Sequence, residues 1–278
     1  MSVELLALDI DGTLLDPYGA LPDAARRAVR EARDAGLTIV LCTGRRYRTA
    51  LPILRELDLE GMVVVNNGAV VKDVASAATL HHSYFPQQLY AEAFALMSEA
   101  GSPLVYIDAY EEGFDMLVDA SAETHPFQSG YLDDHAEHCR FVDGLAEAPR
   151  AEVVMLSHMA DEATLLPLRE RVTQHFGDAL HSHLIWNKNY QGLILELLAA
   201  NSGKWQAVEH VAHARGIDPS RIAAVGDDRN DAELVRRAGF GIAMGNAVDE
   251  VKRGADLVVR SNAEGGVVEA IHAVLNAA

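Results

Sequence analysis

The chain is poor in cysteine, in positive charge and in long hydrophobic runs, and each shortage excludes a class of protein. Two cysteines, Cys42 and Cys139, in 278 residues cannot frame a disulfide scaffold, and they suit a reducing compartment. With 23 lysines and arginines against 41 aspartates and glutamates, the net charge of −18 makes nucleic acid and anionic membranes poor partners. No apolar run approaches the roughly 18 residues that a membrane span needs.

The N-terminal residues also lack the pattern of an export signal. Residues 1–11 read MSVELLALDID, with no basic region and with acids inside the apolar stretch. We therefore expect a cytoplasmic protein. Hydrophobic residues make up 49% of the chain and charged residues 23%, which is ordinary for a globular protein with a full core, and the length favours two domains over one.

Both ends of the chain show short apolar runs that alternate with helical patterns. The runs lie at residues 5–8, 37–42, 62–65, 221–225, 240–244 and 257–259, and helices are predicted at 22–36, 46–57, 229–238, 247–253 and 264–276. Runs without alternation, separated by helices, indicate parallel strands covered on both faces. The predicted fold class is therefore α/β, with a doubly wound, Rossmann-like parallel sheet built from residues 1–83 and 199–278.

The middle of the chain, residues 84–198, is predicted to be an inserted α+β domain. Strands are expected at residues 104–109, 114–120, 139–143, 151–159, 183–186 and 193–198, with helices at 87–100 and 161–176. Strands in adjacent pairs joined by turns indicate a mostly antiparallel sheet with helices on one face.

Polar residues follow four of the strands predicted for the parallel sheet. They are, in chain order, Asp9 and Asp11, Thr43 to Arg45, Asn66 to Gly68, and Gly226 to Asp228. Because the carboxyl ends of parallel strands share one edge, where ligands bind in open α/β sheets, we expect these groups to meet there.

A further helix is predicted over residues 201–216, with Asn201 or Ser202 as its N-cap. Lys204 then falls in the first turn, where a cation opposes the helix dipole. Two interpretations are open: a solvated lysine that costs little, or an ammonium group paired with an anion at the helix N-terminus.

Two acids at the end of a buried strand repel each other unless a cation neutralises them. Asp9 and Asp11 are two residues apart on an extended segment, so their side chains should leave the same face. Mg²⁺ binds such carboxylates and completes its shell with water and phosphate, and Asp227 could be a third ligand. A phosphate ester held by the metal, Lys204 and Thr43 could then be attacked by an aspartate. The sequence therefore predicts a phosphoryl-transfer site.

Four motifs in a fixed order resemble the haloacid dehalogenase superfamily of phosphohydrolases. They are DIDGTLLD (9–16), CTGRR (42–46), Lys204 and GDDRND (226–231). NNGAVV (66–71), residues 239–259 and the pattern of the insertion are similar to its Cof-type subfamily, subclass IIB, which carries a large C2-type cap. The resemblance covers nearly the whole chain. It implies a hydrolase core at 1–83 and 199–278, with residues 84–198 as a cap that sets substrate specificity.

The resemblance also implies a role for each motif residue. Asp9 would be the nucleophile that carries an aspartyl-phosphate, and Asp11 the general acid and then the general base. The Asp9 carboxylate, the Asp11 carbonyl and Asp227 would bind Mg²⁺. The groups that would hold the phosphoryl oxygens are Ile10, Thr43, Gly44, Lys204 and Asn230. Asp228 and Asp231 would orient Lys204 or metal-bound water, although Asp228 could instead cap the helix at 229–238.

Several features allow more than one interpretation. Asn67 and Arg45 are candidates for substrate contact, against a turn role for Asn67 and a solvated helix start for Arg45. HAEHC (135–139) has the residue types of a zinc site but lacks a second ligand pair, so loop histidines are expected. The glycines of residues 239–245 lack the spacing of a dinucleotide fingerprint and favour backbone packing.

The function predicted is that of a Mg²⁺-dependent phosphatase for small phosphorylated metabolites, such as sugar phosphates, acting as a monomer or homodimer. One alternative is a sugar phosphomutase of the same superfamily. Another is a non-catalytic receiver-like module that is phosphorylated on aspartate, although such modules are shorter and have no need of Asp11.

Overall fold

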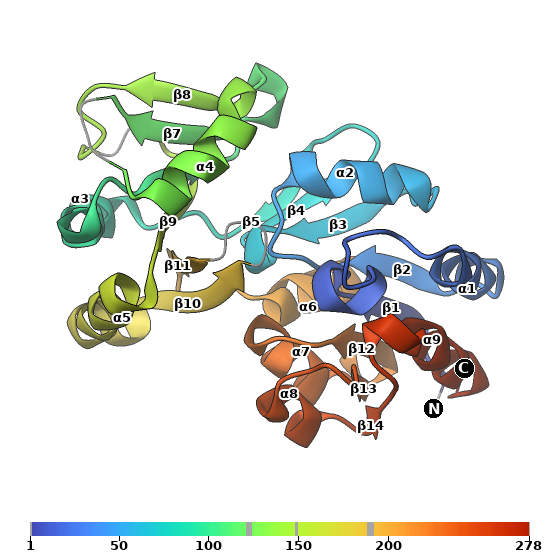
Figure 1. The fold of residues 1–278 in the computed structure, drawn as a ribbon. Coiled ribbons are helices and arrows are strands. Elements are labelled where there is room, and N and C mark those ends of the chain that lie inside the picture. The colour runs from blue at the N-terminus through green and yellow to red at the C-terminus, as the bar shows by residue number, and fades with distance from the viewer. Residues whose placement is uncertain (1, 121–123, 148–149, 188–191, 278) are drawn as a thin grey trace. The chain divides into compact units, whose positions relative to one another are not determined.

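A computed structural model describes residues 2–120, 124–147, 150–187 and 192–277 (Figure 1). The chain divides into two compact units, and the second is inserted into the first. Unit 1 comprises Met1–His82 and Gly203–Ala278, and unit 2 comprises Ser83–Ser202. Within the described ranges, no helix is both long enough and apolar enough to cross a membrane.

Unit 1 is built on a parallel sheet of five strands in the order β14-β13-β12-β1-β2. These strands are β1 (Leu5–Leu8), β2 (Thr38–Leu41), β12 (Ile222–Gly226), β13 (Phe240–Ala243) and β14 (Leu257–Val258). The helices of unit 1 are α1 (Asp23–Asp34), α2 (Tyr47–Glu56), α6 (Lys204–Ala214), α7 (Ala232–Arg237), α8 (Asp249–Gly254) and α9 (Gly266–Ala277). The predicted α/β fold is confirmed, and each of these elements lies within a few residues of its expected position.

Helices cover both faces of this sheet, which explains why its strands are continuously apolar. On one face, Leu5 and Ala7 pack in a buried cluster with residues of α6 and α7, including Trp205 and Leu234. Alternate residues point the other way. Leu6 and Leu8 are nevertheless fully buried, and α1 and α9 pack against each other through their own apolar stripes.

The third apolar run is not a full member of the parallel sheet, which corrects the sequence prediction. β3 (Met62–Val65) pairs antiparallel with β4 (Val70–Asp73), which pairs antiparallel with β5 (Thr79–His82). β3 joins β2 only through an isolated parallel bridge between Cys42 and Val64. The short turn η2 (Asn66–Gly68) folds the chain back into a hairpin, so the hydrogen bonds of β3 go mainly to β4.

Unit 2 contains a sheet of six strands in the order β10-β11-β9-β6-β7-β8, antiparallel except for the β7–β8 pair. Its strands are β6 (Leu104–Ile107), β7 (Met116–Asp119), β8 (Cys139–Val142), β9 (Val153–Ala160), β10 (Leu180–Asn187) and β11 (Gly192–Ala199). Its helices are α3 (Gln87–Met97), α4 (Pro126–Asp134) and α5 (Glu162–Phe176). The mostly antiparallel sheet confirms the prediction for this region, whereas α4 was not predicted.

The predicted N-cap of α6 is wrong. The cap position is Gly203, whose backbone is extended and which offers no side-chain acceptor, and Lys204 is the first helical residue. Ser202 instead donates its hydroxyl to the carbonyl oxygen of Ser83, within unit 2. No side chain therefore caps the start of α6.

Candidate active site

The site of unit 1 forms where β1 and β12 end side by side. Leu8 lies opposite Val225 in the parallel register, and the amide of Asp9 donates to the carbonyl oxygen of Val225 at 3.0 Å. The chain leaves β1 toward β2 on one side, and β12 lies on the other, so this is the point where the strand order reverses. Residues that follow these two strands are thus brought together at the carboxyl edge of the sheet.

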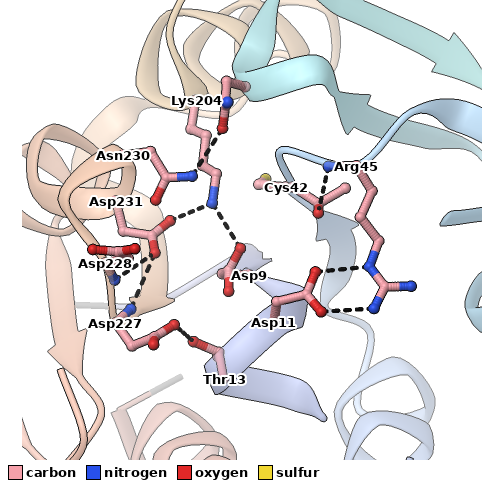
Figure 2. A network of polar contacts seen from close by, with 12 residues as sticks. Asp9, Asp11, Thr13, Cys42, Arg45, Lys204, Asp227, Asp228, Asn230 and Asp231 are labelled. Carbon is pink, nitrogen blue, oxygen red and sulfur yellow. Dashed lines mark hydrogen bonds and ion pairs between the residues drawn. The ribbon is translucent and has the colours of Figure 1, made fainter. Parts of the chain in front are cut away.

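A lysine and two carboxylates form a buried network at this edge (Figure 2). Lys204 Nζ donates to Asp9 Oδ1 and to Asp231 Oδ1, both at 2.6 Å. The three residues are 2%, 4% and 0% exposed, respectively. Of the two sequence interpretations of Lys204, the structure shows a paired ammonium group, contributed by a helix that is far from both acids in sequence.

The pKa values of this network reflect burial and mutual charge. Burial raises the pKa of Asp9 well above its ordinary value, with added repulsion from Asp231 and Asp227, against the opposing charge of Lys204. Burial disfavours the charged form of Lys204, but the two carboxylates outweigh it and raise the pKa of Lys204. The lysine is therefore protonated, and the site has more acids than this one cation neutralises.

Asp227 extends the acidic group toward the turn η1 (Ile10–Leu14). Thr13 Oγ1 donates to Asp227 Oδ1 at 3.1 Å. Gly12 has φ of +86°, and a Cβ at this position would lie 2.1 Å from Asp227 Oδ2. Gly12 is thus required for the backbone conformation and also for the close approach of Asp227. Burial, followed by the charge of Asp231, raises the pKa of Asp227 to about 7.

The donor atoms here suit a hard divalent cation. Carboxylate oxygens of Asp9, Asp227 and Asp231 all lie within 4.8 Å of one another. Asp231 is already engaged, because its Oδ1 accepts from Lys204 and its Oδ2 accepts from the amides of Asp227 and Asp228 at 3.0 and 3.2 Å. Asp231 is also the most buried of the three, and its bonds tie Lys204 to the backbone of the loop that carries Asp227. Oxygen-only donors with excess negative charge favour Mg²⁺ over softer metals.

Asp11 does not join the buried network. Its carboxylate forms a bidentate ion pair with Arg45, with Arg45 Nε at 2.7 Å from Oδ2 and Nη2 at 2.6 Å from Oδ1 (Figure 2). The Asp11 side chain is 57% exposed, whereas that of Asp9 is 6% exposed. The structure thus gives Arg45 a partner that sequence reasoning missed.

The strand end after β2 and the turn after β3 form a second polar group of the site. The amide of Asn67 donates to the carbonyl oxygen of Thr43 at 3.0 Å, and Asn67 Oδ1 accepts from Asn230 Nδ2 at 2.8 Å. A Cβ on Gly44 would lie 3.0 Å from Asn67 Oδ1. Asn67 has φ of +54°, a strained conformation for a residue with a side chain. This buried asparagine therefore braces two of the predicted phosphate-binding residues.

Two further predicted residues lie within the turns that frame the site. Ile10 is fully buried directly behind Asp9. Asp228 is the N-cap of the turn η8 (Arg229–Asp231), and its Oδ1 accepts from the amide of Arg229 at 2.7 Å. The capping role considered for Asp228 is thus the one its side chain performs, while Asp231 makes the contact with Lys204.

Sequence reasoning also missed Thr13 and Asn246. Asn246 Nδ2 donates to Asp227 Oδ2 at 3.2 Å and to the carbonyl oxygen of Gly12 at 2.8 Å. A signal was available, because Asn246 follows β13 as the other polar groups follow their strands. Among the described residues, the group of Asp9, Asp227 and Asp231 is the one set of three potential metal ligands that converge, and HAEHC (135–139) forms no such set.

Comparison with known proteins gives consistent matches along the whole chain. A family model described as haloacid dehalogenase-like hydrolase matches residues 6–271. The chain is 28% identical to the 5-amino-6-(5-phospho-D-ribitylamino)uracil phosphatase YwtE of Bacillus subtilis, which it matches over 99% of both proteins. It is 24% identical to the pyridoxal phosphate phosphatase YbhA of Escherichia coli, over 99% of this chain and 100% of that protein. The solved structure of the HAD subclass IIB sugar phosphatase BT4131 matches with a TM-score of 0.78 and 23% identity, over 97% of this chain and 98% of that one.

Proposed function

The chain belongs to the haloacid dehalogenase-like hydrolases, and we propose that it is a Mg²⁺-dependent phosphatase that cleaves small phosphomonoesters through an aspartyl-phosphate on Asp9. The observation that carries this proposal is the buried contact between Asp9 and Lys204, next to Asp227. A structural ion pair would not need a further acid beside it, whereas a site for a metal ion and a phosphate would.

Mg²⁺ would be held by the carboxylates of Asp9 and Asp227 and by the backbone carbonyl of Asp11. When bound, the ion neutralises the acids and the negative charge of the phosphoryl oxygens. The phosphoryl oxygens would also accept hydrogen bonds that offset their negative charge. We assign these bonds to Lys204, the Thr43 hydroxyl, the amides of Ile10 and Gly44, and the side chain of Asn230. Preorganised donors of this kind stabilise charge most effectively in a site with little water.

In the first step, a carboxylate oxygen of Asp9 forms a bond to phosphorus while the bond from phosphorus to the ester oxygen breaks. Lys204 fixes the orientation of Asp9 through Oδ1. The departing oxygen receives a proton from Asp11, which must release Arg45 to carry that proton. The products of this step are the alcohol and an acyl phosphate on Asp9.

In the second step, a water molecule attacks phosphorus and Asp11 accepts its proton. The bond between phosphorus and Asp9 breaks, which regenerates the carboxylate and releases inorganic phosphate. Asp231 has no bond to form or break in either step. Its contacts with Lys204 and with two backbone amides hold the lysine and the Asp227 loop in fixed positions relative to each other.

The relatives and the insertion support a proposal for the substrate class. YwtE and YbhA are named for small phosphorylated metabolites, and the matched BT4131 structure is that of a sugar phosphatase. We assign this chain a sugar phosphate or similar phosphomonoester as its substrate. Unit 2 is assigned the role of the cap that selects the leaving group.

A panel of phosphate esters, assayed for free phosphate with Mg²⁺ and with EDTA, tests the proposal. We expect Mg²⁺-dependent release from at least one small metabolite ester, and loss of that release in Asp9→Asn. The panel includes hexose 1-phosphates with product analysis. Isomerisation without free phosphate, or unchanged hydrolysis by Asp9→Asn, would contradict the proposal.

A further inference from the structure

Asn246, in the loop between β13 and α8, joins two segments that the proposed function assigns to magnesium. Its Nδ2 donates to Asp227 Oδ2 at 3.2 Å and to the carbonyl oxygen of Gly12 at 2.8 Å. Gly12 directly follows Asp11, whose carbonyl is the proposed backbone ligand. One amide group therefore contacts the carboxylate ligand and the turn that presents the carbonyl ligand.

The hydrogen bond from Asn246 is the second of two that fix the orientation of the Asp227 carboxylate. Thr13 donates to Oδ1 and Asn246 donates to Oδ2, so each carboxylate oxygen has its own donor. Rotation of the carboxylate would break one or both bonds. Hydrogen bonds of this kind fix the direction of a metal ligand's lone pairs before the ion arrives.

The chemical type of the donor is also suitable. A lysine or arginine in this place would compete with the ion for the negative charge of Asp227. The Asn246 amide is neutral, so it orients the carboxylate and leaves that charge available to the cation.

The Asn246 side chain is itself held in place, although the residue is exposed. Its Oδ1 accepts from the main-chain N–H of Asn262 at 2.9 Å. With Oδ1 used as an acceptor there, Nδ2 must face Gly12 and Asp227. Because Asn246 is exposed, it contributes little to core packing, so its substitution should act mainly through these hydrogen bonds.

We propose that Asn246 is a positioning residue that organises Asp227 and the Gly12 turn for Mg²⁺. This inference rests on the proposed function, because it concerns the same ion. It predicts that loss of the Asn246 amide weakens Mg²⁺ binding without loss of the fold. Partners of metal ligands typically change metal affinity 10- to 100-fold, and we expect about tenfold for an exposed residue.

The test measures Mg²⁺ binding by titration calorimetry in protein stripped of metal, for Asn246→Ala and Asn246→Ser. Asn262→Ala is the matched control. It removes the part-buried bond from Asn262 Nδ2 to the Leu15 carbonyl oxygen, but keeps the main-chain donor to Asn246. The unfolding temperature of each variant in EDTA reports on the fold.

The inference is supported if both Asn246 variants raise the Mg²⁺ dissociation constant about tenfold, while Asn262→Ala does not, and all unfold in EDTA at nearly the temperature of the unsubstituted protein. It is overturned if the Asn246 variants bind Mg²⁺ normally, if Asn262→Ala weakens binding equally, or if the Asn246 variants fail to fold. These results would leave the proposed function intact. Failure of the unsubstituted protein to bind Mg²⁺ would overturn both.

Discussion

Arg45 donates two hydrogen bonds to the carboxylate of Asp11, from Nε to Oδ2 at 2.7 Å and from Nη2 to Oδ1 at 2.6 Å. Bidentate pairs of this kind fix a carboxylate in direction as well as in place. Asp11 is held there at the half-exposed rim of the site, while Asp9 lies buried beneath it on Lys204. Asp9 and Asp11 thus have separate cations and separate environments, which suits the two different roles proposed for them.

Arg45 is therefore expected to act through Asp11, because it holds the carboxylate in place at the site until Asp11 leaves it to carry the proton. Arg45→Gln should lower kcat/KM about tenfold or more for an alkyl phosphate, whose leaving group needs a proton, and much less for p-nitrophenyl phosphate. Asp11→Asn should show the same pattern. Steady-state kinetics of the double variant provide the control: it should be no worse than Asp11→Asn alone. Additive losses, or equal losses on both esters, would assign Arg45 a role independent of Asp11.

Lys204 is expected to stabilise the fold as well as the site. Lys204→Met leaves Asp9 and Asp231 buried without their cation, and removing one partner of a buried ion pair costs about 3–5 kcal/mol. Urea unfolding in EDTA measures this loss. Lys252→Met, on the surface helix α8, is the control and should change stability by less than about 0.5 kcal/mol. Similar losses in the two variants would show that the network is not stabilising.

Alanine substitutions at two glycines distinguish the effect of backbone strain from the effect of a clash with Asp227. Gly12 and Gly19 have φ of +86° and +81°, but a Cβ on Gly12 would meet Asp227 Oδ2 at 2.1 Å, and one on Gly19 would meet nothing within 4 Å. Both Gly→Ala variants pay for the unfavourable φ. Calorimetric titration should show that only Gly12→Ala loses Mg²⁺ binding. A normal dissociation constant for Gly12→Ala would mean that Asp227 is not a ligand.

The raised pKa of Asp227 predicts how stability changes with pH in the metal-free protein. The unfolded carboxyl releases its proton near its ordinary pKa of 3.8, whereas the folded one holds it to about 7. Between these values the unfolded state binds fewer protons, so this group makes the fold less stable as pH rises. Urea unfolding in EDTA should therefore show that Asp227→Asn is close to the unsubstituted protein near pH 4 and more stable at pH 8. A difference that does not change with pH would contradict the assigned pKa.

The fold was largely predictable because strand type and strand ends are local features. Leu5–Leu8 and Ile222–Gly226 are apolar runs followed at once by acids, and their pairing in register brings Asp9 and Asp227 together. β3 could not be assigned correctly, because MVVV has the same composition whether its neighbour is a parallel or an antiparallel strand. Its partner was decided by the tight turn at Asn66 and Asn67, both with positive φ.

The proposed site was predictable in its members and much less so in its contacts. The motifs predicted Asp9, Lys204 and Asp231 as members of one site. Their contacts could not be predicted, because the orientation of long or branched side chains depends on tertiary neighbours. The turn of Asp11 toward Arg45 and the brace between Asn67 and Asn230 arise from residues 34 and 163 positions apart. The contacts of Asn246 could not be predicted for the same reason, since its partners lie in other loops.

The formation of a phosphoryl group on Asp9 is the most direct measure of the central claim. The protein, mixed with a cleaved ester and Mg²⁺, is quenched in acid within one turnover and digested, and its peptides are analysed by mass spectrometry. We expect the peptide that contains Asp9 to gain the mass of one phosphoryl group, and the corresponding peptide of Asp9→Asn to gain none. Steady release of phosphate with the Asp9 peptide unmodified at every quench time, or with the phosphoryl group on another residue, would contradict it.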